Sequence, residues 1–379
     1  MRPRSRNLTL AILALLALTV GAVAVAFIAV RGRTPSIIEA NAVASLEEVR
    51  LGGADQWILI RGHDRNKPVL LFLHGGPGMP AMFLAHAFQR ELEHDFVVVH
   101  WDRRGAGRSF EAAQPLESLT VRRTLDDAFE LTRLLRERFK QDRIMLVGHS
   151  WGSYLGLLAI REHPEYYAAY VGTGQIAGSK AEVQLQRREF LTHDASATGD
   201  TALLKRLAGG SDPTEDDLFR HGVELYGARS FWPLLRTGLL APEYTLWDAL
   251  NVKRGADLVG REMRYGTLPR PHEGEVLAVD VPVFFMLGRN DLNTPSVLAA
   301  KYLERLQAPV KELTWFEQSA HFPFFEEPKR FHMEMVRIEG EVRDYWSRRA
   351  VNQTGHVRVA GPPDTRVERT VSGRRQSQP

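Results

Sequence analysis

The chain has 379 residues, of which 44% are hydrophobic and 25% are charged, a composition typical of a folded protein rather than a disordered one. It contains no cysteine, which excludes disulfides, thiolate metal sites and a cysteine nucleophile. The formal net charge is +3, but the basic excess lies in residues 1–33 and 351–379. The part between these ends shows no nucleic-acid signature, so we expect no nucleic-acid partner.

The first predicted element is an apolar helix near the amino terminus. Residues 8–30 carry no charge, and about 20 apolar residues in a helix are enough to cross a bilayer. They follow a basic flank, residues 1–7, and precede a short segment, residues 31–45, that reads as a linker. The length of the apolar run favours an uncleaved, single-pass signal anchor that binds the chain to a membrane.

Two fates of this apolar segment remain open. Small-x-small patterns at Ala22–Ala24 and Ala24–Ala26 also fit a signal peptidase site, and cleavage there would release a secreted protein. Three arginines precede the run, whereas only Arg31 and Arg33 follow it closely. The positive-inside rule therefore favours a cytoplasmic amino terminus and an extracytoplasmic main domain.

The next part of the chain, residues 46–175, alternates predicted strands and helices. An antiparallel hairpin is predicted at its start, and nearly continuous apolar runs then predict strands that are buried on both faces. The predicted strands are Glu47–Leu51, Gln56–Arg61, Val69–Leu73, Phe96–Val99, Ile144–Val147 and Ala168–Val171, and the predicted helices are Thr120–Phe139 and Trp151–Arg161. Such alternation predicts an α/β fold with a mostly parallel, doubly wound sheet.

This alternation is interrupted between residues 176 and 272. The segment is long and mostly helical in pattern, and further strands at Val281–Met286 and Glu312–Phe316 follow it. We therefore predict an inserted helical cap at residues 176–272 and a second part of the core at residues 273–350. The remaining residues, 351–379, are basic and rich in turn-forming residues, which predicts a disordered tail.

One sequence motif predicts a serine nucleophile. Gly148-His149-Ser150-Trp151-Gly152 is a G-x-S-x-G sequence that lies between a predicted strand and a predicted helix. This is the context of a nucleophile elbow, in which a sharp turn exposes the serine hydroxyl above the sheet edge. Glycines flank the serine because the turn leaves no room for larger side chains.

A serine that transfers acyl groups needs two backbone N–H donors to stabilise the negatively charged oxygen of its intermediate. The residue after the nucleophile, Trp151, is expected to supply one donor. The second is expected from a loop after an earlier strand, where His74-Gly75-Gly76-Pro77-Gly78 is found. We assign the second donor to Gly76.

The serine also needs a base and an acid that orients the base. In this fold the acid and the histidine follow the nucleophile in chain order, in loops after late strands. Asp291 and His321 meet this requirement, because each follows one of the last two predicted strands. The sequence therefore predicts Ser150, Asp291 and His321 as the catalytic residues. It shows no metal-ligand cluster and no P-loop, so neither a metal nor a cofactor is expected.

The chain resembles the proline iminopeptidase branch of the α/β hydrolases in three segments, which are the His74–Gly78 loop, the Asp102–Ser109 segment and the elbow Gly148–Ser153. The resemblance covers about residues 45–350. It implies an exopeptidase that releases amino-terminal residues, typically proline, without a cofactor, under a helical cap. Enzymes of this branch hold the substrate amine with cap carboxylates, often beside a tryptophan. The chain has no Trp-Glu pair; Trp247-Asp248 is the nearest analogue, and Glu189, Glu224 and Glu243 are further candidates.

The predicted function is that of a membrane-anchored serine hydrolase that acts on small peptides with a free amino terminus. Two alternatives remain open. The same three residues would serve an esterase, lipase or amidase that acts on small acyl compounds, because the cap decides the substrate. A binding protein without catalysis could also use the same fold, although the intact Ser150, Asp291 and His321 argue against it.

Overall fold

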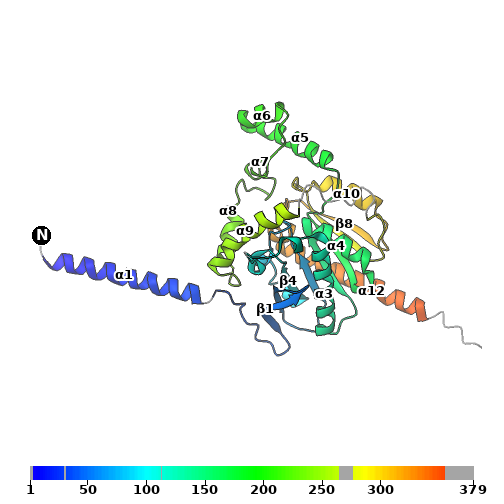
Figure 1. The fold of residues 1–379 in the computed structure, drawn as a ribbon, viewed down its shortest axis with the longest axis horizontal. Helices are drawn as coiled ribbons and strands as arrows, with labels where there is room; N and C mark the ends of the chain where they lie inside the picture. Colours follow the sequence, from blue (N-terminus) through cyan, green and yellow to red (C-terminus); the bar gives the residue numbers. More distant parts are fainter. Residues whose placement is uncertain (1–2, 30, 112, 264–275, 355–379) are drawn as a thin grey trace, which may run out of the picture. The chain divides into compact units, whose positions relative to one another are not determined.

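The computed structural model describes residues 3–29, 31–111, 113–263 and 276–354. Its centre is an eight-stranded sheet in the order β1-β2-β4-β3-β5-β6-β7-β8 (Figure 1). The strands are β1 (Val43–Leu51), β2 (Ala54–Gly62), β3 (Val69–Leu73), β4 (Val97–Asp102), β5 (Ile144–His149), β6 (Tyr167–Thr173), β7 (Val283–Gly288) and β8 (Lys311–Phe316). The first pairings, β1 with β2 and β2 with β4, are antiparallel, and all later pairings are parallel. The predicted mostly parallel sheet is thereby confirmed.

Helices cover both faces of this sheet, as a doubly wound fold requires. The first half of the chain contains α2 (Met82–Phe88), α3 (Val121–Phe139) and α4 (Trp151–Glu162), and the second half contains α10 (Ser296–Arg305), α11 (Pro323–Glu326) and α12 (Pro328–Thr354). Successive side chains of β3 face the two helix layers in turn. Leu71 belongs to a core shared with α3, α4 and α10, whereas Phe72 packs against the rings of Phe88, Phe324 and Phe331 from α2, α11 and α12.

Five helices lie between β6 and β7, inside the range predicted as a cap. They are α5 (Lys180–Thr198), α6 (Thr201–Ala208), α7 (Glu215–Arg220), α8 (Trp232–Leu240) and α9 (Leu246–Glu262). Several begin at capping boxes, in which a Ser or Thr side chain and an acid three residues later satisfy each other's backbone N–H groups. The end of the predicted cap and the start of the predicted second core part, within residues 264–275, lie outside the described residues.

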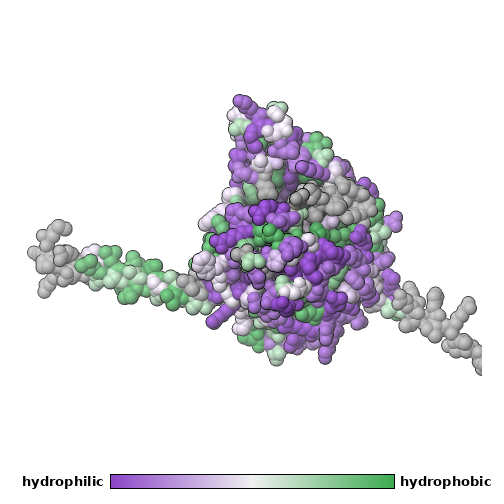
Figure 2. All heavy atoms as spheres, in the orientation of Figure 1, coloured by the Kyte–Doolittle hydropathy of each residue, from purple (hydrophilic) through white to green (hydrophobic). Residues whose placement is uncertain are grey.

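The amino-terminal helix α1 spans Pro3–Ala29. Its stretch Thr9–Ala26 is long and apolar enough to cross a membrane or to act as a signal sequence, and none of it is buried against the rest of the protein. Figure 2 shows the coloured part of this helix as a mostly hydrophobic surface.

Two predicted boundaries differ from the structure. Strand β1 begins at Val43, inside the predicted linker, because its pairing with β2 extends beyond the apolar residues that marked the strand. At the other end, a second compact unit begins at Arg343, and its described part is the helical end of α12. This helix continues to Thr354, inside the predicted disordered tail; residues 355–379 of that tail lie outside the described residues.

Candidate active site

Ser150 occupies a strained turn between β5 and α4. Its φ of 52° and ψ of −123° lie in a region that side-chain-bearing residues rarely adopt. The flanking glycines make this turn possible, since a Cβ on Gly148 would lie 2.7 Å from Gly152 O and one on Gly152 would lie 2.0 Å from Leu73 O. The turn is held by a hydrogen bond from Ser150 N to Thr173 O, at 3.0 Å. Strand, turn and helix thus hold the serine at the carboxyl edge of the sheet.

The loop after β3 lies against this turn. A Cβ on Gly75 would lie 2.9 Å from Ser150 Cβ, so only a glycine allows the loop to approach so closely. The guanidinium of buried Arg103 braces the loop, because its Nη2 donates to Gly75 O at 2.9 Å and to Pro77 O at 2.8 Å. The same guanidinium lies over the ring of Trp151, 4.6 Å from the ring centre.

Two backbone N–H groups beside Ser150 remain free. Neither Gly76 N nor Trp151 N donates a hydrogen bond within the described part of the chain. Trp151 N is free because Trp151 is the first residue of α4, where a helix has no internal acceptor for its N–H groups. These are the two donors that the sequence assigned to the oxyanion.

His321 and Asp291 come together from the loops after β8 and β7. His321 Nδ1 lies 2.9 Å from Asp291 Oδ2, and both side chains are buried. Thr294 fixes the carboxylate, since its backbone N–H donates to Asp291 Oδ1 and its hydroxyl donates to Oδ2, each at 2.9 Å. Burial alone would lower the pKa of His321, but the nearby charges of Asp291 and Glu224 outweigh it and raise that pKa above its ordinary value.

Ser150 and His321 line the same cavity, which has a volume of about 460 Å³. Among the described residues, no hydrogen bond joins the Ser150 hydroxyl to the imidazole; such bonds often tighten only when substrate binds. The ring of His149 packs beside His321, at 4.7 Å between ring centres, and its Nε2 donates to His321 O at 2.9 Å. Burial and the neighbouring His321 hold the pKa of His149 well below its usual range, so it stays a neutral packing partner.

Sequence reasoning missed Glu326, which holds the loop of His321. Its Oε2 accepts hydrogen bonds from the backbone N–H groups on both sides of the histidine, Ala320 at 3.0 Å and Phe322 at 2.9 Å. Its Oε1 accepts from Tyr226 N at 2.6 Å, which ties the segment after α7 to the same loop. Only the proximity of Glu326 to His321 in sequence hinted at this role.

The Asp102–Ser109 segment braces the neighbouring loops. Arg104 forms a buried ion pair with Asp127 of α3, at 2.8 Å. Asp102 accepts hydrogen bonds from Arg108 N, at 2.9 Å, and from the hydroxyl of Tyr244. The segment therefore connects the sheet to α3 and to the turn between α8 and α9.

Comparison with known proteins decides the family. A family model described as the alpha/beta hydrolase family matches residues 70–334. The chain belongs to the α/β-hydrolase family.

The relatives of this α/β hydrolase indicate its branch. It is 30% identical over 307 residues to the "Probable aminopeptidase YbaC" of Bacillus subtilis (strain 168), and the matched region covers 78% of this chain and 96% of that protein. It is 25% identical over 279 residues to the proline iminopeptidase of Heyndrickxia coagulans, covering 70% and 87%. The fold matches a proline iminopeptidase-related protein from Thermus thermophilus with a TM-score of 0.53, at 21% identity, covering 77% and 96%. The predicted hydrolase class and proline iminopeptidase-like branch are confirmed.

The structure distinguishes among the acidic residues of this hydrolase that the sequence offered as candidates to hold the substrate amine. Glu224 is buried, lines the cavity of Ser150 and accepts a hydrogen bond from Asn293 Nδ2 at 3.1 Å. Burial raises the pKa of Glu224 to about 7. Asp248 instead caps α9 and pairs with Arg108, beside an exposed Trp247, and Glu189 is exposed on α5.

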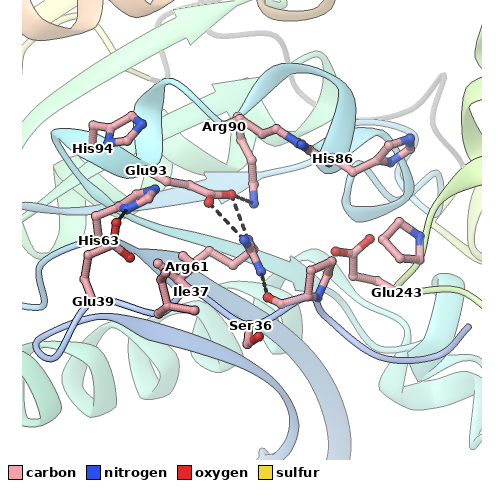
Figure 3. Close-up of a pocket in the computed structure, with 14 residues that line it drawn as sticks. Ser36, Ile37, Glu39, Arg61, His63, His86, Arg90, Glu93, His94 and Glu243 are labelled. Carbon is pink, nitrogen blue, oxygen red and sulfur yellow. Dashed lines mark hydrogen bonds and ion pairs between the residues drawn. The ribbon is translucent and has the colours of Figure 1, made fainter. Parts of the chain in front are cut away.

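The last of these acids, Glu243, lies in a separate cavity of about 370 Å³ that shares no lining residue with the first (Figure 3). This cavity lies between the segment 35–39 and the polar ends of β2 and α2. Figure 3 shows the Arg61 guanidinium directed at Glu93, to which it donates from Nε at 2.8 Å and from Nη2 at 3.1 Å. Burial raises the pKa of Glu243 to about 7. Glu243 therefore does not line the site of Ser150.

Among the described residues, no cluster of His, Asp and Glu could hold a metal ion.

Proposed function

We propose that this chain is a membrane-anchored serine aminopeptidase of the proline iminopeptidase type, with Ser150 as nucleophile, His321 as base and Asp291 as the orienting acid. One observation carries the proposal. A strained serine and a carboxylate-bound histidine, from loops far apart in sequence, line one cavity at the carboxyl edge of the sheet.

In the proposed mechanism, Ser150 Oγ attacks the carbonyl carbon of the scissile amide while His321 Nε2 takes the hydroxyl proton. The carbonyl oxygen becomes negatively charged and accepts hydrogen bonds from Gly76 N and Trp151 N. The C–N bond then breaks, and the imidazolium returns the proton to the leaving amine. Water, deprotonated by the same imidazole, then attacks the acyl carbon; the bond from this carbon to Ser150 Oγ breaks, and the imidazolium returns the proton to Ser150 Oγ. Asp291 stabilises the imidazolium in both halves of the reaction.

An aminopeptidase must also recognise a free amine. Two acids line the cavity, Glu224 and Asp257. Glu224 is the better placed, because it is buried and its backbone carbonyl accepts a hydrogen bond from His321 N at 3.2 Å, whereas Asp257 is exposed and pairs with Lys253. A buried carboxylate suits an ammonium group, since each offsets part of the cost of burying the other's charge. The names of the relatives, an aminopeptidase and a proline iminopeptidase, support the same substrate class.

The membrane location rests on α1, whose apolar stretch is fully exposed. We propose that α1 is a retained anchor and that the hydrolase domain lies outside the cytoplasm. Intact mass measurement of the protein from washed membranes tests retention, since cleavage after Ala24 or Ala26 would remove the apolar helix. Protease digestion of sealed cells tests the orientation: the domain is degraded if it faces outward and protected if it faces inward.

The proposed activity is tested with a chromogenic amide of proline that has a free amine. We expect the purified chain to release the chromophore and to react with a fluorophosphonate probe, and we expect Ser150→Ala to do neither. Parallel rates on short acyl esters separate a peptidase from an esterase. Hydrolysis of esters alone would replace the peptidase proposal, and no covalent labelling of the wild type would overturn the serine mechanism.

A further inference from the structure

The end of the α8–α9 pair carries a cluster of exposed apolar side chains. Leu239 and Leu240 end α8, and Leu246 and Trp247 begin α9; these four residues form what we call the α8–α9 tip. Their exposed fractions are 38%, 56%, 53% and 72%. The same helices expose Trp232, Leu235 and Leu250, which lie at helical spacing from the tip. Clustered apolar exposure of this kind marks an interaction surface.

The tip is held rigidly, because the turn between its two halves is buried. Ala241, Glu243 and Tyr244 are each no more than 1% exposed. The hydroxyl of Tyr244 donates to Asp102, and Arg108 donates to Glu243 O at 2.6 Å. The leucines and the tryptophan therefore point outward from a fixed turn rather than from a loose loop that could fold them away.

The residues that follow α1 contact this same turn. Arg31 Nε donates to Tyr244 O at 2.8 Å, and Arg31 Nη1 donates to Leu239 O. Gly32 N donates to Pro242 O at 2.7 Å. Helix α1 ends at Ala29, two residues before Arg31, and two residues span at most about 7 Å. If α1 is inserted in a bilayer, Arg31 therefore lies within about 7 Å of the end of the inserted helix, and the turn lies one hydrogen-bonded side chain beyond it.

The charges near the tip suit a lipid surface. Arg33 and Arg236 are exposed, and neither forms an ion pair among the described residues. The planar guanidinium of an exposed arginine is well suited to pair with the phosphate group of a lipid headgroup. Tryptophan is the residue that favours the boundary between headgroups and acyl chains.

We infer that the α8–α9 tip inserts into the interface of the membrane that holds α1, as a second contact in addition to the anchor. The inference rests on the proposed membrane location of α1. Insertion of the tip gives the domain a second contact with the membrane and so fixes its orientation. It also brings the catalytic cavity close to the bilayer, because α8 and α9 line this cavity through Leu234, Ala256 and Gly260. The cavity is then held beside the bilayer surface rather than turning freely on a tether.

The absence of cysteine allows a direct test on the full-length chain in lipid nanodiscs. Single cysteines carrying a fluorophore are placed at Trp247→Cys in the tip, Leu16→Cys in α1 and Met333→Cys on α12. Met333 is the matched control, because it is an apolar residue that is 63% exposed far from the tip in sequence. Quenching by lipids with a spin label near the headgroup is compared with quenching by aqueous iodide.

We expect lipid quenching at position 247 to exceed that at position 333 several-fold, and iodide quenching to show the reverse. Equal iodide access at both positions, with lipid quenching at position 16, would overturn the inference while leaving the anchor intact. Protection of position 247 from both quenchers would mean that a protein, such as a second copy of the chain, covers the tip, and would also overturn it. Absence of lipid quenching at position 16 would remove the membrane location on which the inference rests.

Introduction of a negative charge into the tip provides a second measurement. In the Trp247→Cys background, Leu240→Glu is expected to lower lipid quenching to the level of position 333, because a carboxylate disfavours insertion. Val297→Glu, at another exposed apolar residue, is expected to change nothing. Hydrolysis of the soluble proline amide should be unchanged in both variants, which shows that a loss of quenching is not a loss of folding or of the proposed activity.

Discussion

His321 Nδ1 lies 2.9 Å from Asp291 Oδ2, in a pair that is buried on both sides. This contact sets the tautomer of the imidazole, because the proton on Nδ1 points at the carboxylate and leaves Nε2 free to accept a proton. Burial opposes a charged imidazole, but Asp291 and Glu224 raise the pKa of His321 above its ordinary value. The protonated form is inactive as a base, so activity should fall as the pH drops through this pKa.

Replacement of Asp291 by asparagine should lower kcat by about 10³- to 10⁴-fold, because the wrong tautomer of His321 is then favoured. The acid limb of the pH profile should move to lower pH, since a charge that raises the pKa of His321 has been removed. Steady-state kinetics between pH 5 and 9 measure both effects. An unchanged rate with an unchanged acid limb would show that another acid orients the histidine.

Substitution of Gly76 by alanine should remove one oxyanion donor from its position. Gly76 has a φ of 110°, and a Cβ there would lie 2.2 Å from Met79 N and 2.3 Å from Gly78 N, so the loop must shift. We expect kcat to fall by about 10²- to 10³-fold. Gly53→Ala is the control, because its φ is also positive, at 78°, but nothing lies within 4 Å of its added Cβ. An equal effect of the two substitutions on kcat would argue against an oxyanion role.

Glu224→Gln tests recognition of the substrate amine. It should raise KM for the free-amine proline amide and leave KM for an acyl ester without an amine unchanged. Glu189→Gln, at an exposed position of α5, is the control and should alter neither KM. The pKa of Glu224 is raised to about 7, so the wild-type KM for the amide should fall as the pH rises through 7 and the carboxyl ionises. The glutamine variant should lose this dependence, and an equal rise in KM for both substrates would contradict the proposed role.

The same substitution has a predicted effect on stability. The carboxyl of Glu224 has a higher pKa in the folded protein, about 7, than its ordinary value of 4.5, so between these values folding keeps it protonated while unfolding releases the proton. The wild type therefore loses stability as the pH rises from 4.5 to 7, and the loss stays constant above 7. Thermal unfolding should show Glu224→Gln gaining stability relative to the wild type at pH 8 but not at pH 4.

Glu326→Ala should misplace His321 without removing it. The two N–H groups that flank the histidine lose their common acceptor, and a displacement of about 1 Å can cost about 10²-fold in rate. We expect a lower kcat and slower fluorophosphonate labelling, with partial recovery in Glu326→Gln, which retains one carbonyl oxygen. Glu165→Ala, at a surface carboxylate, is the control. If labelling of Glu326→Ala proceeds at the wild-type rate, the carboxylate does not position the histidine.

Local sequence determined much of this protein. The apolar runs of β3 and β5 and the amphipathic stripe of α3 appear at or within a residue or two of the predicted positions, because burial on both faces and helical periodicity are written in consecutive residues. The glycines around Ser150 also reveal a turn that leaves no room for a Cβ at positions 148 and 152. Chain order then sufficed to select Asp291 and His321 as candidates.

Only the tertiary structure decided which acids reach the cavity and what holds the histidine. The sequence left both Glu224 and Glu243 open as candidates, yet the packing of the helices between β6 and β7 places them in different cavities. Glu326 acts through backbone N–H groups, which carry no side-chain signal, and the contacts of Arg31 with Tyr244 join segments more than 200 residues apart. Such contacts depend on how long loops close and pack, which no periodicity of neighbouring residues records.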